Sequence, residues 1–209
     1  MPNDEFDSFE QLARTYREGR DFTVRVVRRA SPYAIVAPHG GKIEPGTSQL
    51  AKAVAGEEHS LYLFEGMKRD ENGRLHITSD VFNEPRCLEI VRTATTVVTI
   101  HGMKSAMPEV QLGGLDESLM QRLEVELGTL AISIRRAIDP RIAGTRQNNL
   151  CNRGRSRRGC QLEISEGLRR RMFRDLTSSG LEQPREAFHE FVAAVRRSLR
   201  DADPGTAAR

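Results

Sequence analysis

Cysteine is scarce in this chain of 209 residues, and its few copies are spaced too irregularly for a disulfide or zinc framework. The cysteines are Cys87, Cys151 and Cys160, an odd set that contains no Cys-x-x-Cys pair. A chain of this length buries enough core to fold without cross-links. The scarcity therefore excludes a small disulfide-stapled domain and predicts a reduced, cytoplasmic setting.

Long apolar stretches are also missing. No run approaches the roughly 20 apolar residues that a membrane-spanning helix needs. Residues 1–5 are acidic and lack the apolar core of a secretory signal. The sequence thus excludes a transmembrane protein, and we expect a cytoplasmic location without a membrane partner.

Lysine is the third shortage, because arginine supplies almost all of the positive charge. Four of the 32 cationic residues are lysine and 28 are arginine, yet the net charge is only +3. The densest arginine runs are 153–158 and 169–171, and Arg side chains bind carboxylates and phosphates in a bidentate manner. A nucleic-acid-binding protein is therefore one alternative. The three Tyr and eight Phe argue against it, because they offer few stacking groups and none interleaves with the run 153–158.

Strand-like and helix-like patterns alternate along the chain and predict a single α/β domain over residues 6–200. Apolar segments with period two or without interruption predict strands, and capped amphipathic segments predict helices. The expected strands are 22–26, 34–37, 61–64, 75–78, 96–100, 110–112 and 161–165. The expected helices are 9–17, 47–55, 85–91, a long one from 116, 166–175 and 186–199, with loops over 38–41 and 141–159 and a disordered tail over 201–209. This order favours a mixed, mostly parallel sheet.

Two histidines occupy matching positions at the ends of buried strands. His39 and His101 each follow a continuous apolar segment and precede a glycine. If the two strands are neighbours, both imidazoles lie at the edge of the sheet where sites of α/β folds gather. Glu44 follows His39 by five residues, in a loop rich in glycine and proline. Two histidines and one glutamate form the ligand set of an open catalytic zinc site, although loop histidines held by local hydrogen bonds fit the same spacing.

A metal-dependent hydrolase also needs a general base that is not itself a metal ligand. Glu163 is the candidate, because it lies within the largely apolar segment 160–165, where an unpaired carboxylate is costly. Alternation along a strand places it on the opposite face from Leu162 and Ile164. The alternative is a solvent-facing position on an edge strand.

Several blocks of the sequence resemble the poly-γ-glutamate hydrolase family of bacteriophages and bacteria, many of whose members carry the label phage-related replication protein. The most specific block is Pro38-His39-Gly40-Gly41-x-Ile43-Glu44-Pro45-Gly46-Thr47. The others are Tyr62-x-Phe64-Glu65-Gly66, Leu75-His76-Ile77-Thr78-Ser79, Glu84-Pro85-Arg86-Cys87, Thr99-Ile100-His101-Gly102, Leu112-Gly113-Gly114, Asn152-Arg153-Gly154 and Gln161-Leu162-Glu163-Ile164-Ser165. The resemblance covers about residues 6–195, almost the whole chain.

The resemblance implies a fold similar to that of zinc carboxypeptidases, with helices on both faces of the sheet and a Zn²⁺ ion at its edge. His39, Glu44 and His101 match the metal ligands of the family, and Glu163 matches its general base. His76, within the segment 75–78, is either a donor that supports the metal ligands or a histidine of the core, and we expect the core position.

The activity implied by the resemblance is hydrolysis of γ-glutamyl amide bonds in poly-γ-glutamate by metal-activated water with a glutamate base. Each residue of that polymer carries a free α-carboxylate, so the binding groove needs cationic groups. Asn152 and Arg153 resemble the Asn-Arg pair that binds a substrate carboxylate in carboxypeptidases, and Arg86 and Arg155 are further candidates. Another zinc amidase, acting on a different N-acyl amino acid or a peptidoglycan fragment, stays open. A phage-derived enzyme of this kind would meet extracellular polymer on cell lysis.

Overall fold

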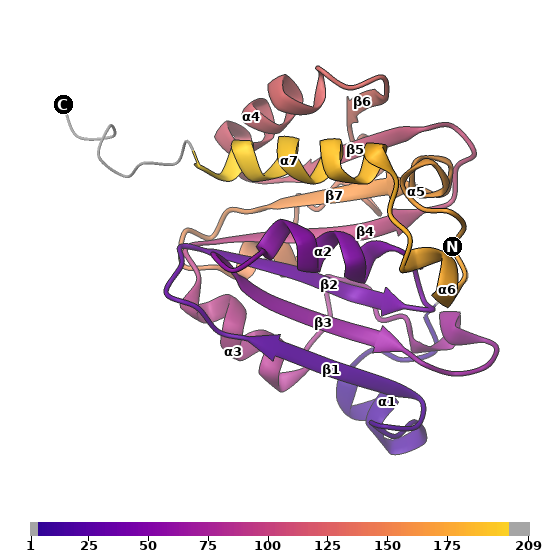
Figure 1. Cartoon of the computed structure of the whole chain (residues 1–209). Coiled ribbons are helices and arrows are strands. Elements are labelled where there is room, and N and C mark those ends of the chain that lie inside the picture. Colours follow the sequence, from indigo (N-terminus) through magenta and orange to yellow (C-terminus); the bar gives the residue numbers. More distant parts are fainter. Residues whose placement is uncertain (1–3, 201–209) are drawn as a thin grey trace.

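A single sheet runs through the protein, and its strand order brings distant parts of the sequence together (Figure 1). The structure, a computed structural model, describes residues 4–200, so the tail expected over 201–209 lies outside the described residues. The 7-stranded sheet has the order β1-β3-β2-β4-β7-β5-β6. Its strands are β1 (Phe22–Val27), β2 (Tyr33–Gly41), β3 (Ser60–Gly66), β4 (Thr96–Met103), β5 (Glu109–Gly114), β6 (Ser133–Arg136) and β7 (Cys160–Ser165).

The centre of the sheet is parallel. Neighbours β3, β2, β4 and β7 all run in one direction, whereas β1 pairs antiparallel with β3 and β5 pairs antiparallel with β7. The edge strand β6 is parallel to β5. The expected mixed, mostly parallel sheet is therefore confirmed. Because β2, β4 and β7 are parallel, their carboxyl ends meet at one edge, which is where a site is expected.

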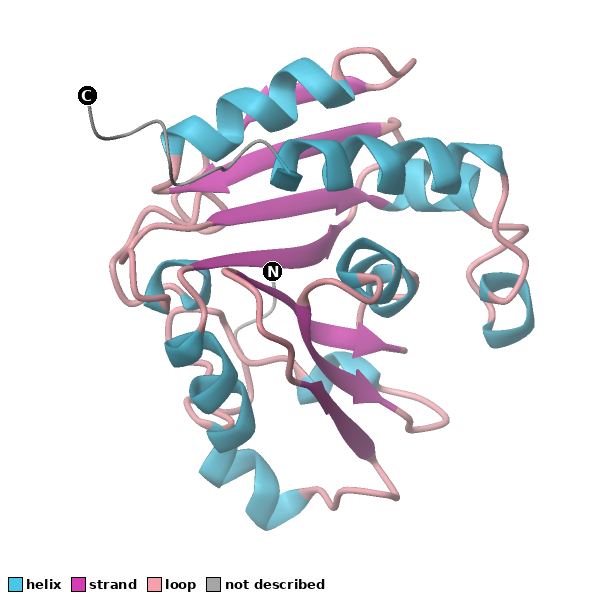
Figure 2. Cartoon of the chain, turned by 60° about the vertical axis from the view of Figure 1, so that its left-hand side comes forward, coloured by secondary structure: helices cyan, strands magenta, loops and turns pink. Residues whose placement is uncertain are grey.

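Helices cover both faces of the sheet, as expected (Figure 2). One face carries the apolar sides of α2 (Thr47–Ala55), α4 (Glu117–Leu127), α5 (Glu166–Met172), α6 (Ser178–Leu181) and α7 (Glu186–Arg200). The other face carries α1 (Phe9–Thr15), α3 (Pro85–Thr93) and the short 3₁₀ helices η1 (Asn72–Leu75) and η2 (Leu150–Arg153). Within residues 4–200, none of the helices has the length and apolar character needed to cross a membrane.

Ser165 joins the central strand β7 directly to α5. It is the last residue of β7, and its side chain accepts a hydrogen bond from the backbone N–H of Leu168, which caps the helix. The chain therefore turns from strand to helix without a loop. Residues of the first turn of α5 consequently lie close to the carboxyl end of β7.

Three local expectations were wrong. The expected loop 38–41 belongs to β2, whose register against β3 shifts between Ala37 and Gly40. The expected strand 75–78 is instead the end of η1 and an extended segment that lies outside the sheet. The strand β6 was not expected, because its residues are half-buried or exposed and carry no apolar alternation strong enough to mark it.

Candidate metal centre and buried glutamate

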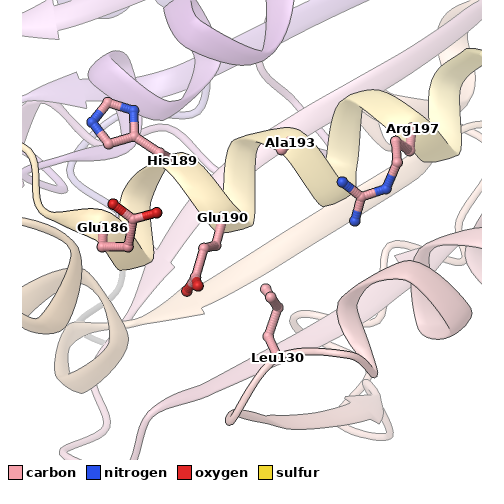
Figure 3. Close-up of a pocket in the computed structure, with 6 residues that line it drawn as sticks. All are labelled: Leu130, Glu186, His189, Glu190, Ala193 and Arg197. Atoms are coloured by element: carbon pink, nitrogen blue, oxygen red, sulfur yellow. The ribbon is translucent and has the colours of Figure 1, made fainter.

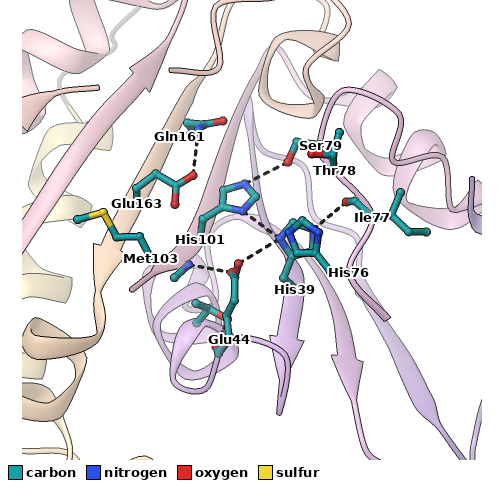
Figure 4. Close-up of polar contacts among 12 residues, drawn as sticks. His39, Glu44, His76, Ile77, Thr78, Ser79, His101, Met103, Gln161 and Glu163 are labelled. Atoms are coloured by element: carbon teal, nitrogen blue, oxygen red, sulfur yellow. Dashed lines mark hydrogen bonds and ion pairs between the residues drawn. The ribbon is translucent and has the colours of Figure 1, made fainter. Parts of the chain in front are cut away.

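Neighbouring strands bring His39 and His101 together, as their positions predict. β2 and β4 pair in parallel, and the register shift near the end of β2, between Ala37 and Gly40, includes His39. Both imidazoles are almost fully buried, with 2% and 4% of their surface exposed. Their Nδ1 atoms lie 3.2 Å apart (Figure 4).

Glu44 joins the two histidines from the turn that follows β2. Its backbone N–H donates to the carbonyl of His39, and its own carbonyl accepts from the hydroxyl of Thr47, so the turn is held at both ends. One carboxylate oxygen, Oε1, lies 3.4 Å from Nδ1 of His39, and the other, Oε2, accepts from the backbone N–H of Gly102 at 2.8 Å. A side chain at Gly102 would not fit, because its Cβ would lie 3.0 Å from the Cβ of Glu44.

The geometry of these three residues fits a tetrahedral metal ion. One ligand atom from each of His39, Glu44 and His101 lies within 4.8 Å of the others. Ligands of a tetrahedral zinc ion, each about 2.0–2.1 Å from the metal, lie about 3.3 Å from one another. The separations of 3.2 Å between the two Nδ1 atoms and 3.4 Å between Nδ1 and Oε1 match that spacing.

The segment 76–79 orients both imidazoles through their remaining nitrogens. Nε2 of His39 donates to the carbonyl of Ile77 at 2.8 Å, and Nε2 of His101 lies 3.4 Å from Oγ of Ser79. Because a carbonyl oxygen only accepts, the neutral ring of His39 carries its hydrogen on Nε2 and presents a lone pair at Nδ1. Partners of this kind fix the ring orientation of metal-binding histidines.

Electrostatics keep two of the three residues ready to bind a cation. Burial disfavours the charged form of Glu44, but the neighbouring His39 outweighs burial and lowers the pKa of Glu44 to about 2. Burial and the charge of His39 lower the pKa of His101 to about 3. Burial opposes a charge on His39 as well, but the Glu44 carboxylate prevails and raises its pKa. The cluster therefore presents an anionic carboxylate and a neutral imidazole at neutral pH.

Glu163 lies beside the cluster on the central strand β7. It is the register partner of His101 across β4 and β7, and only 5% of its surface is exposed. The edge-strand alternative is therefore wrong. Burial raises the pKa of Glu163 well above its usual range, and the negative charge of Glu44 adds to this effect while Arg169 opposes it. The side-chain amide of Gln161 donates to Oε1 of Glu163 at 3.1 Å.

Asn152 is buried in a network of backbone groups. Its side-chain nitrogen donates to the carbonyls of Gly144 and Arg146, and its oxygen accepts from the backbone N–H of Gly159. These contacts fix the conformation of the long loop that precedes β7. All hydrogen-bonding atoms of this side chain thus have partners inside the protein.

Arg153 and Arg86 also have partners within the chain. The guanidinium of Arg153 donates to the carbonyls of four residues, which are Ser79, Asp80, Phe82 and Asn148. Arg86 forms ion pairs with Glu18 and Glu84. The substrate-binding role expected of Asn152, Arg153 and Arg86 stays a prediction, and the structure gives each of them a role in holding backbone or neighbouring side chains.

The arginine run 153–158 extends away from the cluster. The backbone N–H of Arg155 donates to the carbonyl of Ala94, and that of Ser156 donates to the carbonyl of Thr95. Both carbonyls lie just before β4, whereas His101 lies near the end of that strand. Arg155 is therefore not positioned beside the three candidate ligands.

Several residues of the site were not found from the sequence. His76 was expected in the core rather than beside the ligands, but its ring stacks on that of His39 with 3.8 Å between centroids (Figure 4). Its Nδ1 forms a hydrogen bond with a carboxylate oxygen of Asp4 at 2.6 Å. The sequence did carry one signal for this role, because His76 lies in the block 75–79 together with Ile77 and Ser79, which orient the candidate ligands. Gln161 and Arg169 gave no separate signal, because an amide in a strand and one arginine among three look ordinary.

A surface depression of about 370 Å³ lies elsewhere, along α7 (Figure 3). Its lining residues are Leu130, Glu186, His189, Glu190, Ala193 and Arg197. None of them belongs to the buried cluster, so this depression is separate from the candidate metal centre.

Comparison with known proteins agrees with the geometry. Residues 6–194 match the sequence profile of the family described as poly-gamma-glutamate hydrolase. The UPF0714 protein YndL of Bacillus subtilis (strain 168) is 33% identical over 205 residues, which cover 95% of this chain and 79% of that protein. The structure of a bacteriophage poly-gamma-glutamate hydrolase aligns with a TM-score of 0.90 at 30% identity and covers 93% of this chain and 96% of that one. A zinc-free structure of YndL aligns with a TM-score of 0.90 at 32% identity and covers 96% and 99% of the two chains. The chain therefore belongs to the poly-γ-glutamate hydrolase family.

Proposed function

We propose that this protein is a zinc-dependent amide hydrolase that cleaves γ-glutamyl bonds of poly-γ-glutamate. The observation that carries the proposal is the convergence of three ligand atoms within 4.8 Å of one another, with His39 at tetrahedral spacing from both other residues, beside a buried carboxylate. Two imidazoles and a carboxylate are a typical zinc ligand set, and the compared structure of the relative YndL is described as zinc-free. The substrate class is supported by the family to which the chain belongs.

Each residue of the cluster has a distinct task in this reaction. His39, Glu44 and His101 would hold a zinc ion, which would supply Lewis acidity at the scissile carbonyl and lower the pKa of the attacking water. The oxygen of that water bonds to the carbonyl carbon while Glu163 accepts a proton from the water. Glu163 then donates the proton to the departing nitrogen as the C–N bond breaks, which yields a free glutamyl carboxyl and an amine. The amide of Gln161 orients the carboxylate that performs both transfers.

Burial suits Glu163 to both transfers. A group that takes and returns a proton works best when its pKa lies near the working pH. The pKa of an ordinary glutamate is too low for efficient donation to an amine, whereas burial and the charge of Glu44 raise the pKa of Glu163. The ligand Glu44, with a pKa of about 2, stays ionised. The two glutamates therefore divide the work of binding and proton transfer.

A substitution of the base tests the proposal. The wild-type protein, loaded with zinc, is assayed on γ-linked and α-linked oligoglutamate before and after treatment with a chelator. We expect cleavage of the γ-linked substrate only, and loss of activity on chelation that added zinc restores. Glu163→Gln should retain about one zinc per chain but lower kcat by about 100-fold or more, because the amide cannot accept a proton.

Glu190→Gln is the matched control. Glu190 lies exposed on α7, in the depression shown in Figure 3, and this substitution should leave zinc content and kcat unchanged. Near-normal activity of Glu163→Gln would show that the base lies elsewhere. Equal cleavage of α-linked oligoglutamate would remove the γ-glutamyl assignment, and activity unaffected by chelation would remove the zinc.

A further inference from the structure

Arg169 differs from its two neighbours in the arginine run 169–171. It is the one arginine, within residues 4–200, that falls among the buried side chains, with 4% of its surface exposed. Arg170 and Arg171 point away from the core and are exposed. A buried guanidinium is costly unless its N–H groups have partners. The partners of Arg169 therefore indicate what the residue does.

The guanidinium of Arg169 binds three separate backbone segments. Nε donates to the carbonyl of Ile164 at 3.2 Å, Nη1 donates to that of Pro45 at 2.6 Å, and Nη2 donates to that of Met103 at 3.4 Å. All three acceptors are backbone oxygens, so the planar guanidinium group connects chain segments to one another.

Each of these segments carries one residue of the site. Pro45 directly follows Glu44, Ile164 directly follows Glu163, and Met103 lies two residues after His101. No other contact described above links all three segments. The position of Arg169, one turn into the helix that begins where β7 ends, is what allows its side chain to reach them.

Close packing at Gly102 completes the arrangement. A Cβ at this position would lie 2.9 Å from Cζ of Arg169, so the absence of a side chain lets the guanidinium pass next to the backbone. The same glycine donates its backbone N–H to Glu44. The positive charge of Arg169 also lies near the carboxyl groups of Glu44 and Glu163 in the buried site.

We propose that Arg169 is a positioning residue, which sets the relative placement of Glu44, His101 and Glu163 by tying together the segments that carry them. The inference rests on the proposed metal centre, and it adds a dependence of metal geometry and turnover on a side chain that touches neither metal nor substrate. Arg169 thus acts through the backbone that it holds.

The test compares Arg169→Lys and Arg169→Gln with Arg170→Gln as the matched control on the same helix. Affinity for zinc is measured by competition with a chelating dye. The geometry of the ligands is measured from the visible spectrum of the protein loaded with cobalt(II). Kinetics on γ-linked oligoglutamate give kcat and KM separately, and circular dichroism reports the fold.

We expect Arg169→Gln to lower zinc affinity and kcat by about tenfold or more, to change KM less, and to alter the cobalt spectrum. Arg169→Lys should recover part of the loss, since an ammonium group keeps the charge but cannot bind three segments at once. Arg170→Gln should match the wild type. Wild-type affinity, spectrum and kcat in a folded Arg169→Gln protein would overturn the proposal.

The outcomes separate this proposal from the proposed function. Zinc affinity and the cobalt spectrum need no substrate, so they test Arg169 even if the wild type does not cleave γ-linked oligoglutamate. If Arg169→Gln does not fold, Arg169→Lys decides: wild-type affinity, spectrum and kcat in that variant would equally overturn the positioning role.

Discussion

The two imidazoles of the cluster differ in protonation although their Nδ1 atoms lie 3.2 Å apart. Burial and the charge of His39 lower the pKa of His101 to about 3. His39 is equally buried, but its contact with Glu44 outweighs burial and raises its pKa. Of the two candidate ligand histidines, His39 is therefore the one whose proton would compete with a bound metal ion.

Zinc affinity should consequently depend on pH. Below the pKa of His39 the metal competes with a proton, so affinity should rise about tenfold per pH unit and level off above that pKa. Glu44 and His101, with pKa values of about 2 and about 3, contribute no such dependence near neutral pH. Calorimetric titration of zinc into metal-free protein, in buffers of different ionisation enthalpy, measures affinity and the protons released.

His189→Gln is the control for this titration, because His189 is exposed on α7. It should leave the pH curve unchanged. A zinc affinity that is constant between about pH 5 and pH 7, around the ordinary range of histidine titration, would contradict the assignment of the competing proton to His39.

Histidines near the ends of buried strands were predictable as site residues from the sequence. An arginine that acts by binding backbone carbonyls was not. His39, Glu44 and His101 were expected together because two apolar strands each end in His-Gly, and the structure places their ligand atoms within 4.8 Å. Arg169 was not distinguishable from Arg170, because burial of one side chain in a run of three depends on the helix face that meets the sheet.

The segment 76–82, between η1 and α3, supports both imidazoles. It provides the carbonyl of Ile77 and the hydroxyl of Ser79 to the rings of His39 and His101. Arg153 in turn donates to three carbonyls of this segment, which lie within residues 79–82. Arg153 therefore helps to hold the segment that carries the two ring partners.

Arg153→Met should destabilise this segment and the fold. Loss of the guanidinium leaves the partly buried carbonyl of Phe82 without a donor, because the carbonyls of Ser79 and Asp80 also accept from Leu150 and Asn148. An unsatisfied group of this kind costs about 1–3 kcal/mol in the free energy of unfolding. Urea unfolding of the metal-free protein measures this cost. Arg155→Met, an exposed neighbour that binds Oγ1 of Thr95, should change stability far less. Wild-type stability combined with a raised KM would instead support the substrate-binding role expected from the resemblance.

Elements with strong local patterns were predicted well, and elements defined by their neighbours were not. Asp116 caps α4 by accepting from the backbone N–H of Leu119, as its residue type predicts. The segment 75–78 has the alternation of a strand but pairs with no strand of the sheet. Ser133–Arg136 lacks that alternation and still pairs with β5, because an edge strand needs only one partner.

At the scale of the molecule, the candidate ligands come from the middle of the sheet. β2 and β4 are adjacent central strands, so an ion that binds the native cluster and not the unfolded chain stabilises the whole fold. At about 100 times its dissociation constant, zinc should add about 2.7 kcal/mol to the free energy of unfolding. For a domain of this size, the midpoint of thermal unfolding should rise by about 5–10 °C.

Differential scanning calorimetry of chelator-treated and zinc-loaded protein measures this rise. His101→Gln, which removes one ligand, should show little dependence of its midpoint on zinc. An equal rise in wild type and His101→Gln would place the stabilising zinc outside the cluster.

The class of fold was predictable from the order of elements, but the order of strands was not. Alternating strands and helices predicted a mixed, mostly parallel sheet, which the structure confirms. The insertion of β7 between β4 and β5 depends on pairing between residues far apart in the chain, such as His101 and Glu163. Local patterns carry no information on such partners.

The insertion of β7 also determines the order in which the residues of the site are assembled during synthesis. Synthesis proceeds from the amino end, and chains begin to fold in that direction. His39, Glu44 and His101 leave the ribosome well before Glu163, which arrives with the last strand and enters the interior of the sheet rather than its edge. A chain synthesised only as far as β6 thus holds the three candidate metal ligands but not the proposed proton acceptor. If the proposed mechanism holds, hydrolytic activity begins only after β7 has entered the sheet.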